Sequence, residues 1–193
     1  MKKSPFLLLV MVCVNLLAIH TVKAQSDDFK FVVEKSAINK KLWSQPYRFE
    51  DKTLRVLSVE IITTPVDSKN RELNFDLFSL YDETNMLRIR PNAVFYYKGD
   101  KKVYLKSKAV NANYNHFIET TIKNYTNFEA KIYKPNFLGR KKKDSKSSVK
   151  SLKKITLKGK AVTYYVDFPI RENFSYGKVH YNDAPIGFAA AKN

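Results

Sequence analysis

The pattern that most restricts the fold is a clear alternation of apolar and polar residues between Thr53 and Thr64. Leu57, Val59 and Ile61 occupy every second position, so they project from one face of an extended chain. A helix would instead need apolar residues three and four apart. This stretch therefore predicts a strand that has one face in a core.

Similar short extended runs recur along the chain, separated by turn residues such as those of 82–85 and 98–101. The predicted strands cover 29–33, 53–64, 73–77, 86–97 with an interruption at Pro91, 103–105, 117–123, 128–133, 155–157, 161–168 and 178–181. Residues 36–48 are ambiguous between helix and extended chain, and 187–193 resemble a small-residue tail. About 8 to 10 short strands at this spacing predict an all-β fold, a single antiparallel β-sandwich.

One detail of this pattern is irregular. The apolar positions shift by one at Phe78 and Leu80, directly after the alternating run 73–77. Such a shift indicates either a bulge or a strand that is buried on both faces.

The N-terminus predicts a cleavable signal peptide over residues 1–24. Lys2 and Lys3 precede an apolar run of about 15 residues, which is too short to cross a roughly 30 Å hydrocarbon core comfortably as a helix. Val22 and Ala24 then supply the small residues that a signal peptidase accepts. We therefore expect an exported protein, periplasmic or extracellular in a bacterial host, with no transmembrane helix in the mature chain.

The mature chain, from Gln25 on, would contain no cysteine, since Cys13 is the only one in the sequence. Disulfides and thiolate metal sites are then excluded, and the domain has to be stabilised by its core. Residues 25–193 are enough for that, because a chain of this size buries roughly two thirds of its unfolded surface. We expect one domain over 25–193, with a basic loop at 139–154.

Charge is concentrated in one segment. Without the leader, which carries three lysines, 32 basic residues stand against 18 acidic ones, a net charge of +14. The stretch from Gly139 to Lys160 contributes ten basic residues and one acid, Asp144. The rest of the mature chain is only mildly basic.

We interpret this segment as a candidate anion-binding site, because clustered lysines attract phosphate and sulfate groups without sequence preference. The candidate residues are Arg140, Lys141, Lys142, Lys143, Lys146, Lys150, Lys153 and Lys154. Two alternatives remain open: a flexible solvated loop, or an exposed strand whose lysines protect a sheet edge from aggregation. The aromatic and lysine-rich hairpin around 95–106 is better explained by one aromatic face in the core.

Catalytic and metal-binding patterns are weak. His116 and His180 have no second histidine, cysteine or carboxylate at a metal-ligand spacing, and the acids are scattered over turns and strand faces. No nucleophile elbow or phosphate-binding glycine loop occurs. We therefore expect no enzyme activity and no cofactor.

Residues 73–82, followed by the extended 87–91, resemble the segment of small exported bacterial immunoglobulin-like sandwiches in which a hydrophobic strand meets an acidic turn. The whole chain is similar to secreted proteins of unknown function that are common in Bacteroidota. This resemblance covers about 20 residues, implies an extracytoplasmic binding domain, and carries over no functional residue.

The leading hypothesis is a non-enzymatic, exported sandwich that binds an anionic lipid, a glycan or another polyanion, or a cell-envelope protein, through its basic segment. One alternative is a small outer-membrane β-barrel, against which the short strands and the polar C-terminus argue. A second alternative is a hydrolase whose acids or His116 converge only in space.

Overall fold

The computed structural model describes residues 23–39, 45–67, 69–109, 122–138, 140–141 and 146–191. Of the expected leader, only Lys23 and Ala24 belong to these ranges, and they pair with the next strand along the chain. His116 and the strand expected over 117–123 lie outside the described residues, apart from 122 and 123. No helix in the described ranges has the length and apolar character needed to span a membrane.

A six-stranded sheet forms the larger layer, and every pair of neighbouring strands within it is antiparallel. Its order is β1 (Lys23–Gln25), β2 (Phe29–Asn39), β4 (Arg55–Pro65), β15 (Val162–Ile170), β8 (Ala93–Lys98) and β9 (Lys101–Tyr104). The alternating run of the sequence is β4, and Leu57, Val59 and Ile61 are all buried, as predicted. β4 lies between β2 and β15, two strands from opposite ends of the chain.

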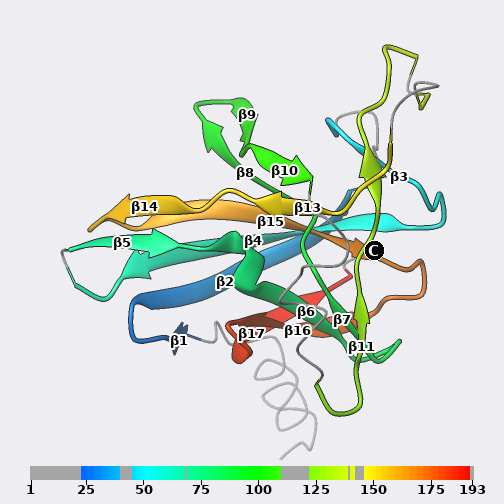
Figure 1. The fold of residues 1–193 in the computed structure, drawn as a ribbon. Coiled ribbons are helices and arrows are strands. Elements are labelled where there is room, and N and C mark those ends of the chain that lie inside the picture. Colours follow the sequence, from blue (N-terminus) through cyan, green and yellow to red (C-terminus); the bar gives the residue numbers. More distant parts are fainter. Residues whose placement is uncertain are drawn as a thin grey trace, which may run out of the picture.

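The second layer is a five-stranded sheet, which lies below the long strands β2, β4 and β15 in Figure 1. Its order is β11 (Thr126–Phe128), β7 (Leu87–Ile89), β6 (Phe78–Asp82), β16 (Tyr176–Tyr181) and β17 (Ala184–Ala190). Only β11 and β7 are parallel. Three further strand pairs are β3 (Arg48–Phe49) with β12 (Ile132–Tyr133), β5 (Asn70–Leu73) with β14 (Ile155–Lys158), and β10 (Ser107–Ala109) with β13 (Lys150–Leu152).

One hydrophobic core joins the two layers. Phe31 of the six-stranded sheet meets Phe78 and Tyr181 of the five-stranded sheet, with ring centroids 5.7 and 4.8 Å apart. The all-β, antiparallel class predicted from the sequence is confirmed. Both sheets are open, with two edge strands each among the described residues, so these strands do not make a single closed sheet.

The segment from Leu73 to Leu77 differs from the prediction of one continuous strand. β5 ends at Leu73, and Phe75–Leu77 form a 3₁₀ turn, which begins where the Asn74 side chain accepts a hydrogen bond from the Asp76 amide. This turn accounts for the shift by one in the apolar positions at Phe78 and Leu80. β6 after it is buried at every position, which confirms the alternative of a strand buried on both faces.

The C-terminal residues 184–190 form β17, where the sequence analysis expected a small-residue tail from 187 on; that prediction was wrong. The small residues have a packing reason. A Cβ atom at Gly187 would lie 2.5 Å from Cγ2 of Val33 in β2, so only glycine lets the two strands approach this closely.

This contact gives a test of the fold. Gly187→Ala should lower the free energy of unfolding by about 1–3 kcal/mol, because it overpacks a stiff β-branched neighbour. Adding Val33→Ala should restore part of the loss, so that the two effects are clearly non-additive in chemical denaturation. Ala184→Ser, at an exposed position of the same strand, is the control, and additive effects of Gly187→Ala and Val33→Ala would contradict the packing.

Candidate anion-binding groove

The basic segment enters the fold through β13, which pairs with β10. Lys108 lies opposite Ser151, and Ser107 lies opposite Leu152. This register places lysines from two distant parts of the chain around one groove of about 450 Å³. The groove is lined by Lys106, Lys108, Ser151, Leu152, Lys153 and Lys154, and we call it the lysine groove.

Charge in the lysine groove is of one sign, since four of its six lining residues are lysines and none is acidic. Lys154 forms an ion pair with Glu72, 3.0 Å away, and both side chains are largely exposed. In the described part of the chain, no ion pair involves Lys106, Lys108 or Lys153, which are exposed. These three ammonium groups are therefore available to an anionic ligand.

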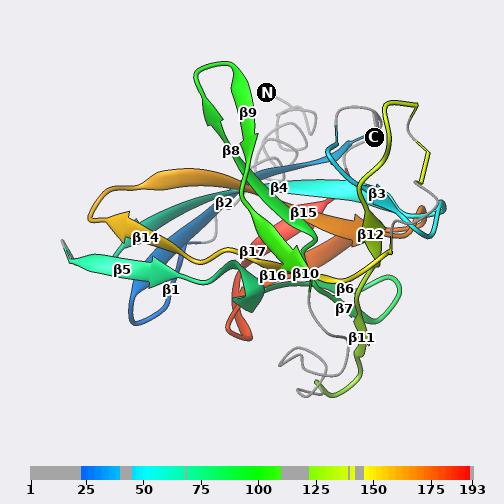
Figure 2. The ribbon, with the colours of Figure 1, turned by 45° about the horizontal axis from the view of Figure 1, so that its top comes forward.

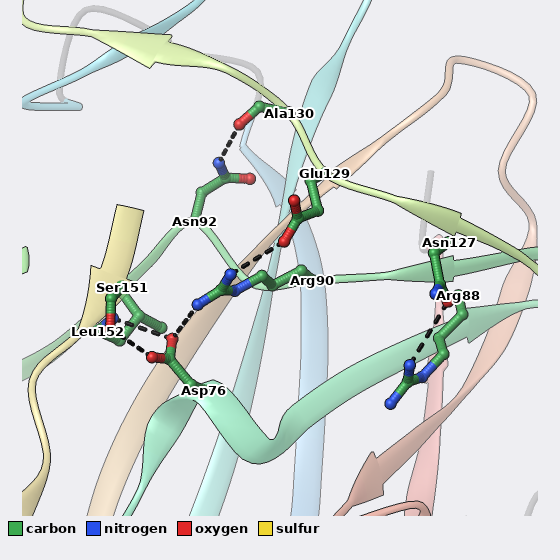
Figure 3. A network of polar contacts seen from close by, with 9 residues as sticks. All are labelled: Asp76, Arg88, Arg90, Asn92, Asn127, Glu129, Ala130, Ser151 and Leu152. Carbon is green, nitrogen blue, oxygen red and sulfur yellow. Dashed lines mark hydrogen bonds and ion pairs between the residues drawn. The ribbon is translucent and has the colours of Figure 1, made fainter. Parts of the chain in front are cut away.

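The half-buried carboxylate of Asp76 fixes β13 in place (Figure 3). Asp76 Oδ2 accepts a hydrogen bond from the Ser151 hydroxyl, and Oδ1 accepts one from the Leu152 amide at 3.0 Å. The Leu152 side chain is only 4% exposed and belongs to the main core. β13, which leads directly into Lys153 and Lys154, is therefore attached through both its backbone and its side chains.

The same carboxylate neutralises a buried cation. The Arg90 side chain is 4% exposed, and its guanidinium donates to Asp76 at 2.7 Å and to Glu129 at 2.9 Å. Burial by itself lowers the pKa of Arg90, but the hydrogen bonds and charges of Asp76 and Glu129 outweigh it and raise the pKa. Arg90 is consequently charged, and it ties the turn before β6 to the segment between β11 and β12.

The structure divides the predicted site residues into two groups. Lys153 and Lys154 line the lysine groove, Lys150 is half-buried on β13, and exposed Lys146 precedes that strand. Arg140 and Lys141 belong to a separate turn after β12, where Lys141 pairs with Glu50 at 3.2 Å. Lys142 and Lys143 lie outside the described residues. The segment 139–154, expected as one loop, thus contains the strand β13.

Sequence reasoning did not identify Lys106 and Lys108 as site residues. Their signal was a lysine at every second position in 106–108, a spacing that in extended chain directs both side chains to one side. Nothing in the local sequence shows that this strand pairs with residues more than 40 positions away, as β10 does with β13.

The aromatic hairpin β8–β9 contributes one residue to the main core and others to a separate aromatic cluster. Val94 belongs to the main core, whereas Phe95 stacks on Tyr165 with ring centroids 4.8 Å apart. The Lys102 ammonium lies 3.5 Å from the centroid of the Phe95 ring. Phe95, Lys102 and Tyr165 line a shallow hollow on the six-stranded sheet together with the half-exposed Tyr97. The expectation that the aromatic face of the hairpin lies in the core is therefore met only in part.

A buried acid lies beside this hollow. Asp167 accepts hydrogen bonds from the hydroxyls of Tyr47, at 3.1 Å, and Ser58. Burial raises the pKa of Asp167 to about 6, although Ser58, the charge of Lys102 and Tyr47 act in the opposite direction. Burial also lowers the pKa of Lys102, against the charge of Asp167.

His180, the histidine within the described residues, lies in neither the lysine groove nor the hollow on the six-stranded sheet. His180 lies in β16, and its ring is stacked on Tyr81 at 3.8 Å. Its pKa is lowered by burial, and its Nδ1 contacts the backbone carbonyl of Asp183. Within the described ranges, no group of three histidine, cysteine or acidic residues is arranged to hold a metal ion.

Two of the acids scattered over the sequence, Asp82 and Asp183, make contacts that stabilise the fold. Asp82 accepts the backbone amides of Thr84 and Asn85 and so stabilises the turn after β6. Asp183 pairs with Arg88 at 2.8 Å.

No protein-family model matches this chain, and no curated protein or solved structure matches it. The resemblance to exported bacterial sandwiches stays a prediction, and the function has to be inferred from the geometry of the lysine groove.

Removing the Asp76 carboxylate tests the attachment of β13. Asp76→Ala should lower the free energy of unfolding by about 3 kcal/mol, because it leaves part of the buried Arg90 charge uncompensated. Hydrogen exchange should also show that the Leu152 amide loses its protection. Asp67→Ala, which removes a half-exposed ion-pair partner of Arg71, is the control and should have a much smaller effect. Unchanged protection at Leu152 would contradict the attachment.

Asp167 predicts a specific pH dependence of stability. Its folded pKa of about 6 lies above the unfolded value of about 3.9, so the native state holds the proton more tightly. This contribution is complete below pH 4 and is lost as the pH rises through about 6, a change of about 3 kcal/mol. Urea unfolding of wild type and Asp167→Asn from pH 4 to pH 7 should therefore show wild type losing stability relative to the variant, and parallel profiles would contradict it.

Proposed function

We propose that this is an exported, non-enzymatic protein that binds an anionic surface through the lysine groove. The observation that carries the proposal is the convergence of Lys106 and Lys108 with Lys153 and Lys154 around one groove, where the pairing of β10 with β13 brings two distant parts of the chain together. The expected contact segment and a second, distant lysine pair share one groove.

The chemistry of the groove favours phosphate or sulfate groups. A lysine ammonium is a compact charge with three donors on a flexible stem, which suits clustered oxyanions and gives little sequence or shape selectivity. The strand pair keeps the lysine backbones close together, although their charges repel one another. A polyanion reduces this repulsion when it binds, and added salt weakens the attraction.

Export belongs to the same proposal, and the leader over residues 1–24 supports it. We also propose that the fold is an immunoglobulin-like sandwich, for which the two mainly antiparallel sheets around one core are the support. Outside the cytoplasm, the available polyanions are anionic lipids, acidic glycans and nucleic acids. A cell-envelope protein with an acidic surface is the alternative ligand.

Binding of a soluble polyanion tests the proposal. Wild-type protein should bind polyphosphate with an affinity that falls steeply with added salt. In the triple variant Lys106→Gln, Lys108→Gln, Lys153→Gln, the salt slope of log affinity should decrease by roughly one for each lysine removed. Titration calorimetry or fluorescence anisotropy over a series of salt concentrations measures both quantities.

The matched control removes the same charge elsewhere. Lys30→Gln, Lys52→Gln, Lys69→Gln changes three exposed lysines that lie outside the groove and the basic segment. Equal losses in the two triple variants would show that net charge alone causes the attraction, and would overturn the assignment to the lysine groove. Absence of salt-dependent binding in wild type would leave edge protection as the role of these lysines.

A further inference from the structure

Two adjacent large apolar side chains are exposed on the turn that follows β12. Phe137 is 95% exposed and Leu138 is 54% exposed. A single exposed leucine needs no explanation, but a phenylalanine with almost its whole surface in water is costly and unusual. A contact that covers both side chains would recover this free energy.

The turn is stabilised by its own hydrogen bonds. Asn136 Oδ1 accepts the backbone amides of Leu138 at 3.0 Å and of Arg140 at 2.9 Å. The Asn136 amide in turn donates to the Arg140 carbonyl, and Pro135 forms a bridge with Lys141. The turn therefore holds the apolar pair outward and does not let it fold back onto the core.

Basic residues flank this apolar tip along the chain. Lys134 precedes the turn, Arg140 and Lys141 follow it, and all three are exposed. The Lys141 ammonium is held by Glu50 and lies 5.8 Å from the centroid of the Tyr133 ring. An apolar tip flanked by basic residues is complementary to the interface of an anionic bilayer, where acyl chains lie beneath negative headgroups.

The loop that carries this tip projects on the same side of the molecule as the β8–β9 hairpin. In Figures 1 and 2, the loop after β12 and the β8–β9 hairpin both project upward from the sheets, and in Figure 1 β10 and β13 lie lower, between the two. The hairpin carries the half-exposed Tyr97 and the exposed Lys98 and Lys101. The hairpin and the loop, which carry these exposed apolar and basic residues, thus project on one side of the molecule.

We propose that the anionic surface is a phospholipid bilayer, and that Phe137 and Leu138 insert into its interfacial layer while the lysine groove contacts the headgroups. This inference rests on the proposed function and adds an apolar component to it. A purely electrostatic ligand would use the groove and leave Phe137 in water.

Vesicle binding separates the two components. The protein in its exported form is sedimented with vesicles of phosphatidylcholine alone or mixed with phosphatidylglycerol, and the same samples are titrated with polyphosphate. Phe137→Ser, Leu138→Ser should weaken binding to the mixed vesicles by at least about tenfold, since each side chain loses most of its transfer free energy. Its affinity for polyphosphate should equal that of wild type.

Two further variants make the test specific. Phe188→Ser removes a phenylalanine that is 57% exposed on β17 of the five-stranded sheet, and this variant should bind vesicles like wild type. Phe137→Trp should show a blue-shifted fluorescence increase on mixed vesicles, relative to wild type, whose only tryptophan is Trp43. All variants share one N-terminus, so the leader cannot account for a difference among them.

The outcomes distinguish failure of membrane insertion from failure of anion binding by the lysine groove. Vesicle affinity unchanged in Phe137→Ser, Leu138→Ser, or no fluorescence shift in Phe137→Trp, overturns membrane insertion even if polyphosphate still binds. Loss of binding in Phe188→Ser equal to that of the tip variant overturns it as well. If wild type binds neither vesicles nor polyphosphate, the proposed function itself is wrong.

Discussion

The buried guanidinium of Arg90 sets the condition on which the rest of this structure depends. A cation that is 4% exposed requires nearby anions, and the fold supplies Asp76 from the turn before β6 and Glu129 from the segment between β11 and β12. Asp76 has further acceptor capacity, which the Ser151 hydroxyl and the Leu152 amide use. Neutralising one buried charge thus also determines where the basic strand β13 lies.

This attachment explains how so basic a segment can be part of a folded layer. Lysines of one sign repel one another, and a stretch rich in lysine and serine has little to bury. Leu152 enters the core, and β10 pairs with β13, so the backbone is held while the charged side chains face solvent. The turn at Asn136 presents its apolar pair in a comparable way, through hydrogen bonds within the loop.

The sequence predicts the parts of this structure that follow from local periodicity. The alternation of 53–64 identifies β4 and its buried face, and the phase shift at Phe78 indicates a strand buried on both sides. The sequence analysis missed β17 because its small residue Gly187 is required by a close contact with Val33 of β2, which local composition does not reveal. Half of the lysine groove was missed for a similar reason, because the pairing of β10 with β13 is a long-range contact.

The central claim is that the paired strands β10 and β13 form the contact for anions. Backbone amide chemical shifts, recorded by NMR while polyphosphate is added, test it most directly. The account predicts that the largest shift changes cluster at residues 106–109 and 150–154, and that they decrease when salt is raised. Shift changes spread evenly over the surface lysines, or concentrated at the hollow beside Asp167, would contradict it.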